Sequence, residues 1–201
     1  LVNNRFAMGG TGAASAAQRH AHIPLLLHPD PRRALFLGVG TGITMGAAAV
    51  YDGLEVDGVE LVPEVLDVRS HFEPFNQLRP GMKLHVADAR RFIRATKTRY
   101  DVIVADLFHP ARDGAGALYT TEHFQAVRQR LEPGGLFCQW LPLFQLDEPT
   151  LRVIIRTFLE VFPDARAFML RWTIDTPVLG LVASLGPGTY APDWFETRVH
   201  G

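Results

Sequence analysis

The sequence is poor in cysteine, in net charge and in long apolar runs. Cys138 is the single cysteine among 201 residues, which excludes an internal disulfide and a cysteine-rich metal site. The 20 lysines and arginines nearly balance the 21 aspartates and glutamates, so the chain lacks the basic footprint of a nucleic-acid or membrane-surface protein. No uninterrupted run of about 18 apolar residues occurs, so we expect no membrane contact from this segment.

We also expect no secretory leader in this segment. The chain begins with Leu1 rather than Met and ends in "TRVHG", so we expect a piece of a longer protein whose other parts could include a membrane segment. A single cysteine fits a reducing, cytoplasmic setting for this part. His20 and His22 are two residues apart, which does not place them on one helix face, so we expect no metal site.

Short apolar runs typical of buried strands alternate with stretches of helical composition. The predicted strands are 34–39, 55–61, 83–88, 100–108, 136–141, 165–172 and 177–184. Such alternation predicts an α/β, Rossmann-like, doubly wound sheet of about seven strands with helices on both faces. The last two strands follow each other without a helix, so we expect the sheet to be mainly parallel with a terminal antiparallel strand.

The same pattern divides the chain into three parts. Residues 1–31 form an N-terminal extension and a helix that leads into the sheet. Residues 32–186 form the nucleoside-binding, Rossmann-like catalytic domain. Residues 187–201 are a C-terminal tail.

Candidate binding groups follow consecutive predicted strands. In an open parallel sheet, ligands bind beyond the carboxyl ends of the strands, near the point where the strand order reverses. The first strand is followed by "GVGTG", whose glycines permit positive φ and a close approach of the backbone to a ligand. The acids at the ends of the second, third and fourth strands are Glu60, Asp88 and Asp106. We predict a cofactor site formed by Gly38, Gly40, Thr41, Gly42, Glu60, Leu61, Asp88, Ala89 and Asp106.

Each of these features also has a purely structural interpretation. The glycines can serve only a tight turn between a strand and a helix. Asp88 can be the N-cap of the helix that follows it. Glu60 can be a solvated strand end. The joint pattern favours a nucleoside site, because four consecutive strand ends each offer a suitable group.

The glycine spacing points to one class of nucleoside. A dinucleotide-binding dehydrogenase prefers G-x-G-x-x-G. Here the third glycine, Gly42, comes one position early and Ile43 occupies the later position. The spacing therefore favours an adenosyl-sulfonium ligand over NAD.

Several motifs resemble the spermidine synthase family, the polyamine aminopropyltransferases, over about residues 20 to 185. They are "LFLGVGTG", "VDGVELVPEV", "VADARRFI", "YDVIVADLFHP", "LYTTEHFQAVRQRLEPGGLFCQWLP" and "VLGLVAS". The sequence is most similar to bacterial spermidine-synthase-like proteins, in which such a domain can be joined to a membrane segment. The family shares the fold of the class I methyltransferases.

The resemblance implies decarboxylated S-adenosylmethionine as the cofactor and a small-molecule amine as the acceptor. It assigns the glycine loop to 38–42, the ribose-binding acid to Glu60 and the adenine-side acid to Asp88. Asp106 matches the aspartate that acts as general base and removes a proton from the amine. Members of this family often form dimers, so a homodimer is a further expectation.

The acceptor side departs from the family pattern. Where the family has D-S-S-D-P, this chain has Asp106-Leu107-Phe108-His109-Pro110. A tyrosine and a glutamate of the family fall near Ala16 and Gln18, and a later tyrosine near Ile174, beside Trp172. We predict that His109, Trp172 and Gln18 bind the acceptor; for His109 alone, a role as a polar loop residue is the slightly favoured alternative.

Three functions stay open at this point. The first is an aminopropyltransferase-like enzyme that uses decarboxylated S-adenosylmethionine. The second is a methyltransferase that uses intact S-adenosylmethionine. The third is a non-catalytic domain that retains nucleoside binding. The acid at position 106 and the scarcity of lysine and arginine near the glycine loop favour the first.

Overall fold

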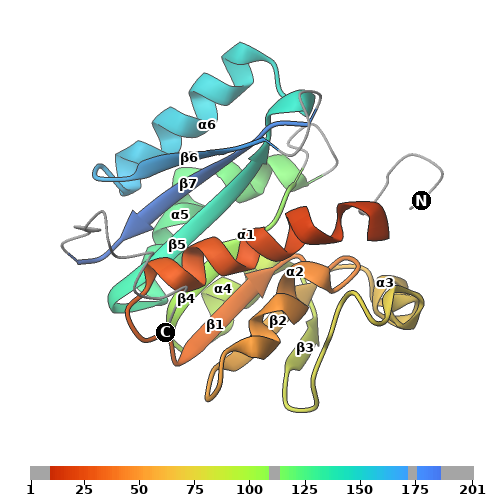
Figure 1. Ribbon diagram of the computed structural model, residues 1–201. Helices are drawn as coiled ribbons and strands as arrows, with labels where there is room; N and C mark the ends of the chain where they lie inside the picture. The colour runs from red at the N-terminus through yellow and green to blue at the C-terminus, as the bar shows by residue number, and fades with distance from the viewer. Residues whose placement is uncertain (1–9, 109–113, 172–175, 187–201) are drawn as a thin grey trace.

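Seven strands of the described residues form one sheet (Figure 1). The structure is a computed structural model that describes residues 10–108, 114–171 and 176–186. The strand order is β3-β2-β1-β4-β5-β7-β6, and β7 runs antiparallel to both of its neighbours. The strands are β1 (Arg33–Leu37), β2 (Glu55–Glu60), β3 (Lys83–Val86), β4 (Tyr100–Ala105), β5 (Leu131–Pro142), β6 (Arg166–Leu170) and β7 (Val178–Ser184).

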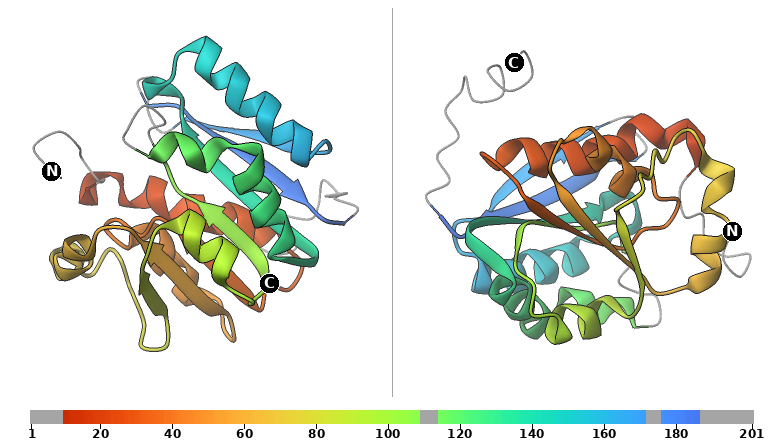
Figure 2. Two further views of the ribbon diagram at one scale, coloured as in Figure 1. Left: turned by 180° about the vertical axis from the view of Figure 1, so that it is seen from behind. Right: turned by 90° about the horizontal axis from the view of Figure 1, so that it is seen from below.

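Helices cover both faces of this sheet (Figure 2). α1 and α2 lie on one face, and α4, α5 and α6 lie on the other. The helices are α1 (Ala14–Leu27), α2 (Ile43–Gly46), α3 (Pro63–Asp67), α4 (Ala89–Ala95), α5 (Thr121–Gln129) and α6 (Glu148–Val161). The predicted doubly wound α/β fold, with its final antiparallel strand, is confirmed.

The continuous apolar runs of the central strands are explained by burial on both faces. In β1, Leu35 and Leu37 point to the core beneath α4, α5 and α6, whereas Ala34 and Phe36 point to the core beneath α1 and α2. β4 alternates in the same way. A parallel strand in this position needs apolar side chains at successive positions.

Some element boundaries differ from the prediction. The stretch of helical composition after the first strand forms the four-residue α2 followed by a 3₁₀ helix, Ala47–Val50. β5 begins earlier than expected, at Leu131, because the strand pairs with β4 across a register shift. β3 and β4 end earlier than expected, at Val86 and Ala105, where the chain turns toward the following segments.

Among the described residues, no helix has the length and apolar character needed to cross a bilayer. The division of the chain at residues 31 and 186 stays a prediction.

Gly46, the last residue of α2, lets the β2–β3 connection pass directly over the helix. A Cβ atom at this position would lie 1.3 Å from the backbone oxygen of Asn76. The side chain of Asn76 is buried, and its amide donates to the carbonyl oxygens of Thr41 (3.2 Å) and Arg69 (2.8 Å). The connection therefore braces the glycine loop from outside the sheet.

We expect Gly46→Ala to destabilise the fold by roughly 1–3 kcal/mol, because the backbone of Asn76 must move to admit the methyl group. Urea denaturation would measure the free energy of unfolding. Gly12→Ala is the matched control, since nothing lies within 4 Å of a Cβ at Gly12. Equal stabilities of the two variants would contradict this close contact.

Candidate functional site

Backbone hydrogen bonds bring the ends of four adjacent strands together at one edge of the sheet, here called the carboxyl rim. The N–H of Ala87 donates to the carbonyl oxygen of Glu60 at 2.9 Å, which joins β3 to β2. The N–H of Gly38 donates to the carbonyl oxygen of Val59 at 2.9 Å, which joins β1 to β2. The N–H of Asp106 donates to the carbonyl oxygen of Leu37, the last residue of β1, at 3.0 Å. The groups predicted from sequence therefore follow one another across β3, β2, β1 and β4.

The glycine loop has the backbone conformation that its sequence predicts. Gly38, Gly40 and Gly42 have φ values of 85°, 54° and 81°. Only glycine adopts this region without strain. At Gly38 a second constraint applies, because a Cβ would lie 3.0 Å from the ring of Phe108.

The carboxylate of Glu60 is bound to the backbone of the glycine loop. Its Oε2 accepts the N–H groups of Val39 (3.1 Å) and Gly40 (3.0 Å), and its Oε1 accepts the N–H of Val62 (3.0 Å). A carboxylate oxygen accepts about two hydrogen bonds, so Oε1 keeps one acceptor position and Oε2 keeps none. Glu60 is therefore a structural anchor with capacity for one further donor.

Asp88 caps α4. Its carboxylate accepts the backbone N–H groups of Arg90 (2.8 Å) and Arg91 (3.1 Å), and it also pairs with the Arg90 guanidinium at 3.2 Å. Burial acts to raise the pKa of Asp88, but the hydrogen bonds from Arg90 and Arg91 outweigh it and lower the pKa below 3.8. The helix-capping role considered from sequence is therefore present. A role of Asp88 on the adenine side of a nucleoside stays a prediction.

Asp106 directly follows β4 and is partly buried. Its Oδ1 accepts the N–H of Leu107 at 2.8 Å and lies 3.8 Å from Nδ1 of His20. The hydroxyl of Thr44, in α2, donates to Oδ2 at 3.4 Å. The carboxylate thus faces the α1–α2 layer, whereas Asp88 faces α4.

The start of the loop after β4 is held by Tyr119. Its hydroxyl donates to the carbonyl oxygen of Phe108 at 2.6 Å. Burial raises the pKa of the Tyr119 hydroxyl, and the charge of Asp106 raises it further, so this group stays neutral. Burial, assisted by Asp106, also raises the pKa of the Cys138 thiol.

The other predicted site residues have varied positions. Leu61 is 64% exposed just beyond β2, and Ala89 is the first residue of α4. Thr41 is buried and contributes its carbonyl oxygen to Asn76. Gln18 is half-buried on α1, two residues from His20 and so about 200° away around the helix. His109 and Trp172 lie outside the described residues.

Sequence reasoning missed three residues that contact the predicted site. His20, Thr44 and Asn76 reach Asp106 or the glycine loop from α1, α2 and the β2–β3 connection. The sequence carries a signal for His20, because this polar residue lies at helical spacing from the apolar residues Pro24 and Leu27, with which it is buried in α1. Asn76 had none, since its role depends on a contact 35 residues away.

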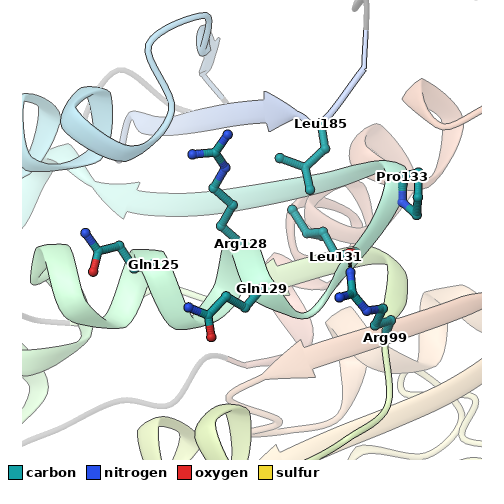
Figure 3. Close-up of a pocket in the computed structure, with 7 residues that line it drawn as sticks. All are labelled: Arg99, Gln125, Arg128, Gln129, Leu131, Pro133 and Leu185. Carbon is teal, nitrogen blue, oxygen red and sulfur yellow. Dashed lines mark hydrogen bonds between the residues drawn. The ribbon is translucent and has the colours of Figure 1, made fainter.

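A hollow of about 520 Å³ lies at the opposite edge of the sheet, near the starts of β4 and β5 (Figure 3). Its lining residues are Arg99, Gln125, Arg128, Gln129, Leu131, Pro133 and Leu185. The carboxyl rim lies at the other end of these strands. This hollow is therefore separate from the site around Asp106.

Comparison with known proteins identifies a family and several relatives. The spermine/spermidine synthase domain family matches residues 17–176. The polyamine aminopropyltransferase of Nitrosomonas europaea is 31% identical over 155 residues, which cover 74% of this chain and 47% of that protein. Putrescine N-methyltransferase 2 of Nicotiana attenuata is 29% identical over 181 residues, which cover 86% of this chain and 47% of that protein.

Solved structures show the same fold. A spermidine synthase in complex with the transition-state analogue AdoDATO superposes with a TM-score of 0.77 at 24% identity, covering 86% of this chain and 61% of that one. Human methyltransferase-like protein 13 in complex with SAH has a TM-score of 0.67 at 22% identity, covering 94% and 88%. The chain spans about half the length of the curated relatives that it matches.

The lowered pKa of Asp88 predicts a pH-dependent contribution to stability. A carboxyl whose pKa is lower in the folded state stabilises the protein above the unfolded value of 3.8, and this contribution is lost as the pH falls through the folded value. Asp88→Asn keeps a cap but loses the charge. We therefore expect wild type to exceed this variant in free energy of unfolding near pH 7, and the difference to shrink below pH 3.8.

Urea titrations at several pH values would measure this difference. Asp67→Asn, at an exposed position at the end of α3, is the control. A difference between wild type and Asp88→Asn that is constant with pH would show that the charge of Asp88 does not stabilise the fold.

Proposed function

The chain belongs to the spermine/spermidine synthase family, and on that premise we propose that it is a transferase. The reaction that we propose moves an aminopropyl group from decarboxylated S-adenosylmethionine to a small-molecule amine. Asp106 is the general base. A homodimer and a cytoplasmic setting remain predictions.

One observation carries the proposal: a glycine loop and two acids occupy the ends of three adjacent strands. The glycine loop follows β1, Glu60 ends β2 and Asp106 follows β4. β1 lies between β2 and β4. The connection from β1 to β2 runs through α2 on one face of the sheet, and the connection from β3 to β4 runs through α4 on the other face, so the strand order reverses at β1. This is where open α/β sheets bind nucleosides.

The adenosine part of the substrate fits the β2–β3 end of the rim. Leu61 and Val86 are 64% and 57% exposed just at these strand ends, which supplies apolar surface for a flat base. The remaining acceptor position on Oε1 of Glu60 suits one ribose hydroxyl. The sulfonium then lies toward Asp106, across the glycine loop.

Asp106 supplies the chemistry at the other end. An alkylamine is protonated in neutral water and cannot attack until it loses a proton. Asp106 accepts that proton, and the freed nitrogen lone pair forms a bond to the carbon beside the sulfonium. The carbon–sulfur bond breaks, its electron pair stays on sulfur, and methylthioadenosine leaves. The carboxylate also attracts both cationic reactants.

A second candidate function is N-methyl transfer from intact S-adenosylmethionine. The similarity to a putrescine N-methyltransferase over 86% of this chain favours it. The intact cofactor carries one more carboxylate than the decarboxylated form. Two N–H groups of the glycine loop already bind Glu60, which leaves fewer donors for that extra carboxylate. A non-catalytic nucleoside-binding domain is the third possibility.

Calorimetric titration would separate the first two functions. We expect decarboxylated S-adenosylmethionine to bind at least tenfold more tightly than the intact form, a difference of about 1.4 kcal/mol. The physical reason is the repulsion between the extra carboxylate and the acids of the rim. Tighter binding of the intact form by the same factor would favour methyl transfer instead.

Replacement of the base tests the catalytic role. Asp106→Asn keeps an oxygen for the N–H of Leu107 but cannot accept the amine proton. We expect turnover to fall by roughly 10²–10⁴-fold with nucleoside affinity changed by less than about threefold. Release of methylthioadenosine from a panel of amines would measure it, with Asp164→Asn, at an exposed position before β6, as the control. Unchanged turnover would remove Asp106 as the base, and no turnover in wild type would favour a non-catalytic domain.

A further inference from the structure

His20 is a buried histidine that faces Asp106 from α1. Its side chain is 5% exposed, and its Nδ1 lies 3.8 Å from Oδ1 of Asp106. At this distance the contact is electrostatic rather than a hydrogen bond. No other imidazole contacts this carboxylate among the described residues.

The ring of His20 is held in place by Trp140. The two rings stack with centroids 4.7 Å apart and an interplanar angle of 28°. The indole N–H of Trp140 also donates to the backbone oxygen of His20 at 2.9 Å. The imidazole is therefore fixed in orientation by a fully buried residue of β5.

The two ring nitrogens of His20 have different surroundings, and this difference favours one tautomer of the imidazole. Nε2 is buried and has no hydrogen-bond partner, so a proton there would be an unsatisfied donor. It would also direct the Nδ1 lone pair at the Asp106 carboxylate. A proton on Nδ1 instead places the positive end of an N–H dipole 3.8 Å from a negative charge, which is electrostatically favourable even without a hydrogen bond.

We propose that His20, as the Nδ1–H tautomer, is a positioning residue for the Asp106 carboxylate. The proposal rests on the proposed function, in which Asp106 is the base. Oδ1 is held by the Leu107 N–H at 2.8 Å and by the His20 dipole. Oδ2 has one long hydrogen bond, from Thr44 at 3.4 Å, and is the oxygen left to accept the amine proton.

The other groups around Asp106 do not provide an alternative. Thr44 on α2 is a neutral hydroxyl. Burial raises the pKa of the Tyr119 hydroxyl, before α5, and that of the Cys138 thiol, on β5, so both stay protonated at neutral pH. The Thr44 hydroxyl contacts Oδ2 through a long hydrogen bond of 3.4 Å, so His20 is the side chain that faces Oδ1.

The tautomer can be observed without any turnover. Proton–nitrogen correlation spectra of protein labelled with ¹⁵N in its eight histidines separate protonated from unprotonated ring nitrogens. The spectrum of His20→Asn assigns the His20 signals by difference. We expect protonated Nδ1 in wild type and a changed Nδ1 signal in Asp106→Asn. A proton on Nε2, or an Nδ1 signal indifferent to Asp106→Asn, would overturn the proposal.

Two substitutions test the positioning role in turnover. Asn places an amide donor near the position of Nδ1, whereas Leu fills the buried space without a donor. We expect His20→Leu to lower kcat about tenfold more than His20→Asn does, with KM for the nucleoside unchanged. A purely packing role predicts the reverse order, since the apolar side chain suits the contact with Trp140 better.

His22→Leu is the matched control, because His22 contacts Tyr51 instead of Asp106. We expect it to leave kcat at the wild-type value. If no amine supports turnover in wild type, the proposed function fails, and the tautomer measurement alone decides the inference about His20. If wild type turns over and His20→Leu matches or exceeds His20→Asn, the proposed function stands and His20 has only a packing role.

Discussion

The contact on which the carboxyl rim depends is the one between the Glu60 carboxylate and the backbone of the glycine loop. Glu60 ends β2, and its three accepted hydrogen bonds bind the turn after β1 and its own following segment. Without this carboxylate, the N–H groups of Val39 and Gly40 would lose their hydrogen-bond acceptor. The cost is about 1–3 kcal/mol for each such group that is buried. The glycine loop after β1 is therefore shaped by an acid of the neighbouring strand.

This constraint changes how the acid of the second strand should be understood. An acid in this position is expected to bind ribose, yet Glu60 already uses most of its acceptor capacity within the protein. It orients the loop first and offers one position to a ligand second. Asn76 adds a second restraint from outside the sheet through the carbonyl oxygen of Thr41. The glycine loop is consequently preorganised, with little ordering left for binding to supply.

The two faces of the sheet contribute differently to the rim. On the face covered by α4, Asp88 caps a helix and pairs with Arg90, so its charge is balanced locally. On the face covered by α1 and α2, Asp106 meets a hydroxyl and an imidazole, neither of which carries a permanent positive charge. Of the three acids, Asp88 is thus the one paired with a cation, whereas Glu60 and Asp106, at the ends of β2 and β4, have no cationic partner among the described ion pairs with Lys or Arg.

Apolar periodicity and strand-end position are local properties of the chain, so the sheet, the glycine loop and the acids at three strand ends could be predicted from the sequence. The sequence could not determine what each carboxylate contacts. Glu60 binds the loop, Asp88 binds its own helix and Asp106 faces His20, and the two long-range contacts join residues about 20 and 86 positions apart. Only the packing of α1 against β4 and β5 placed His20 beside Asp106. Such contacts depend on the crossing of whole elements, which spacing along the chain does not encode.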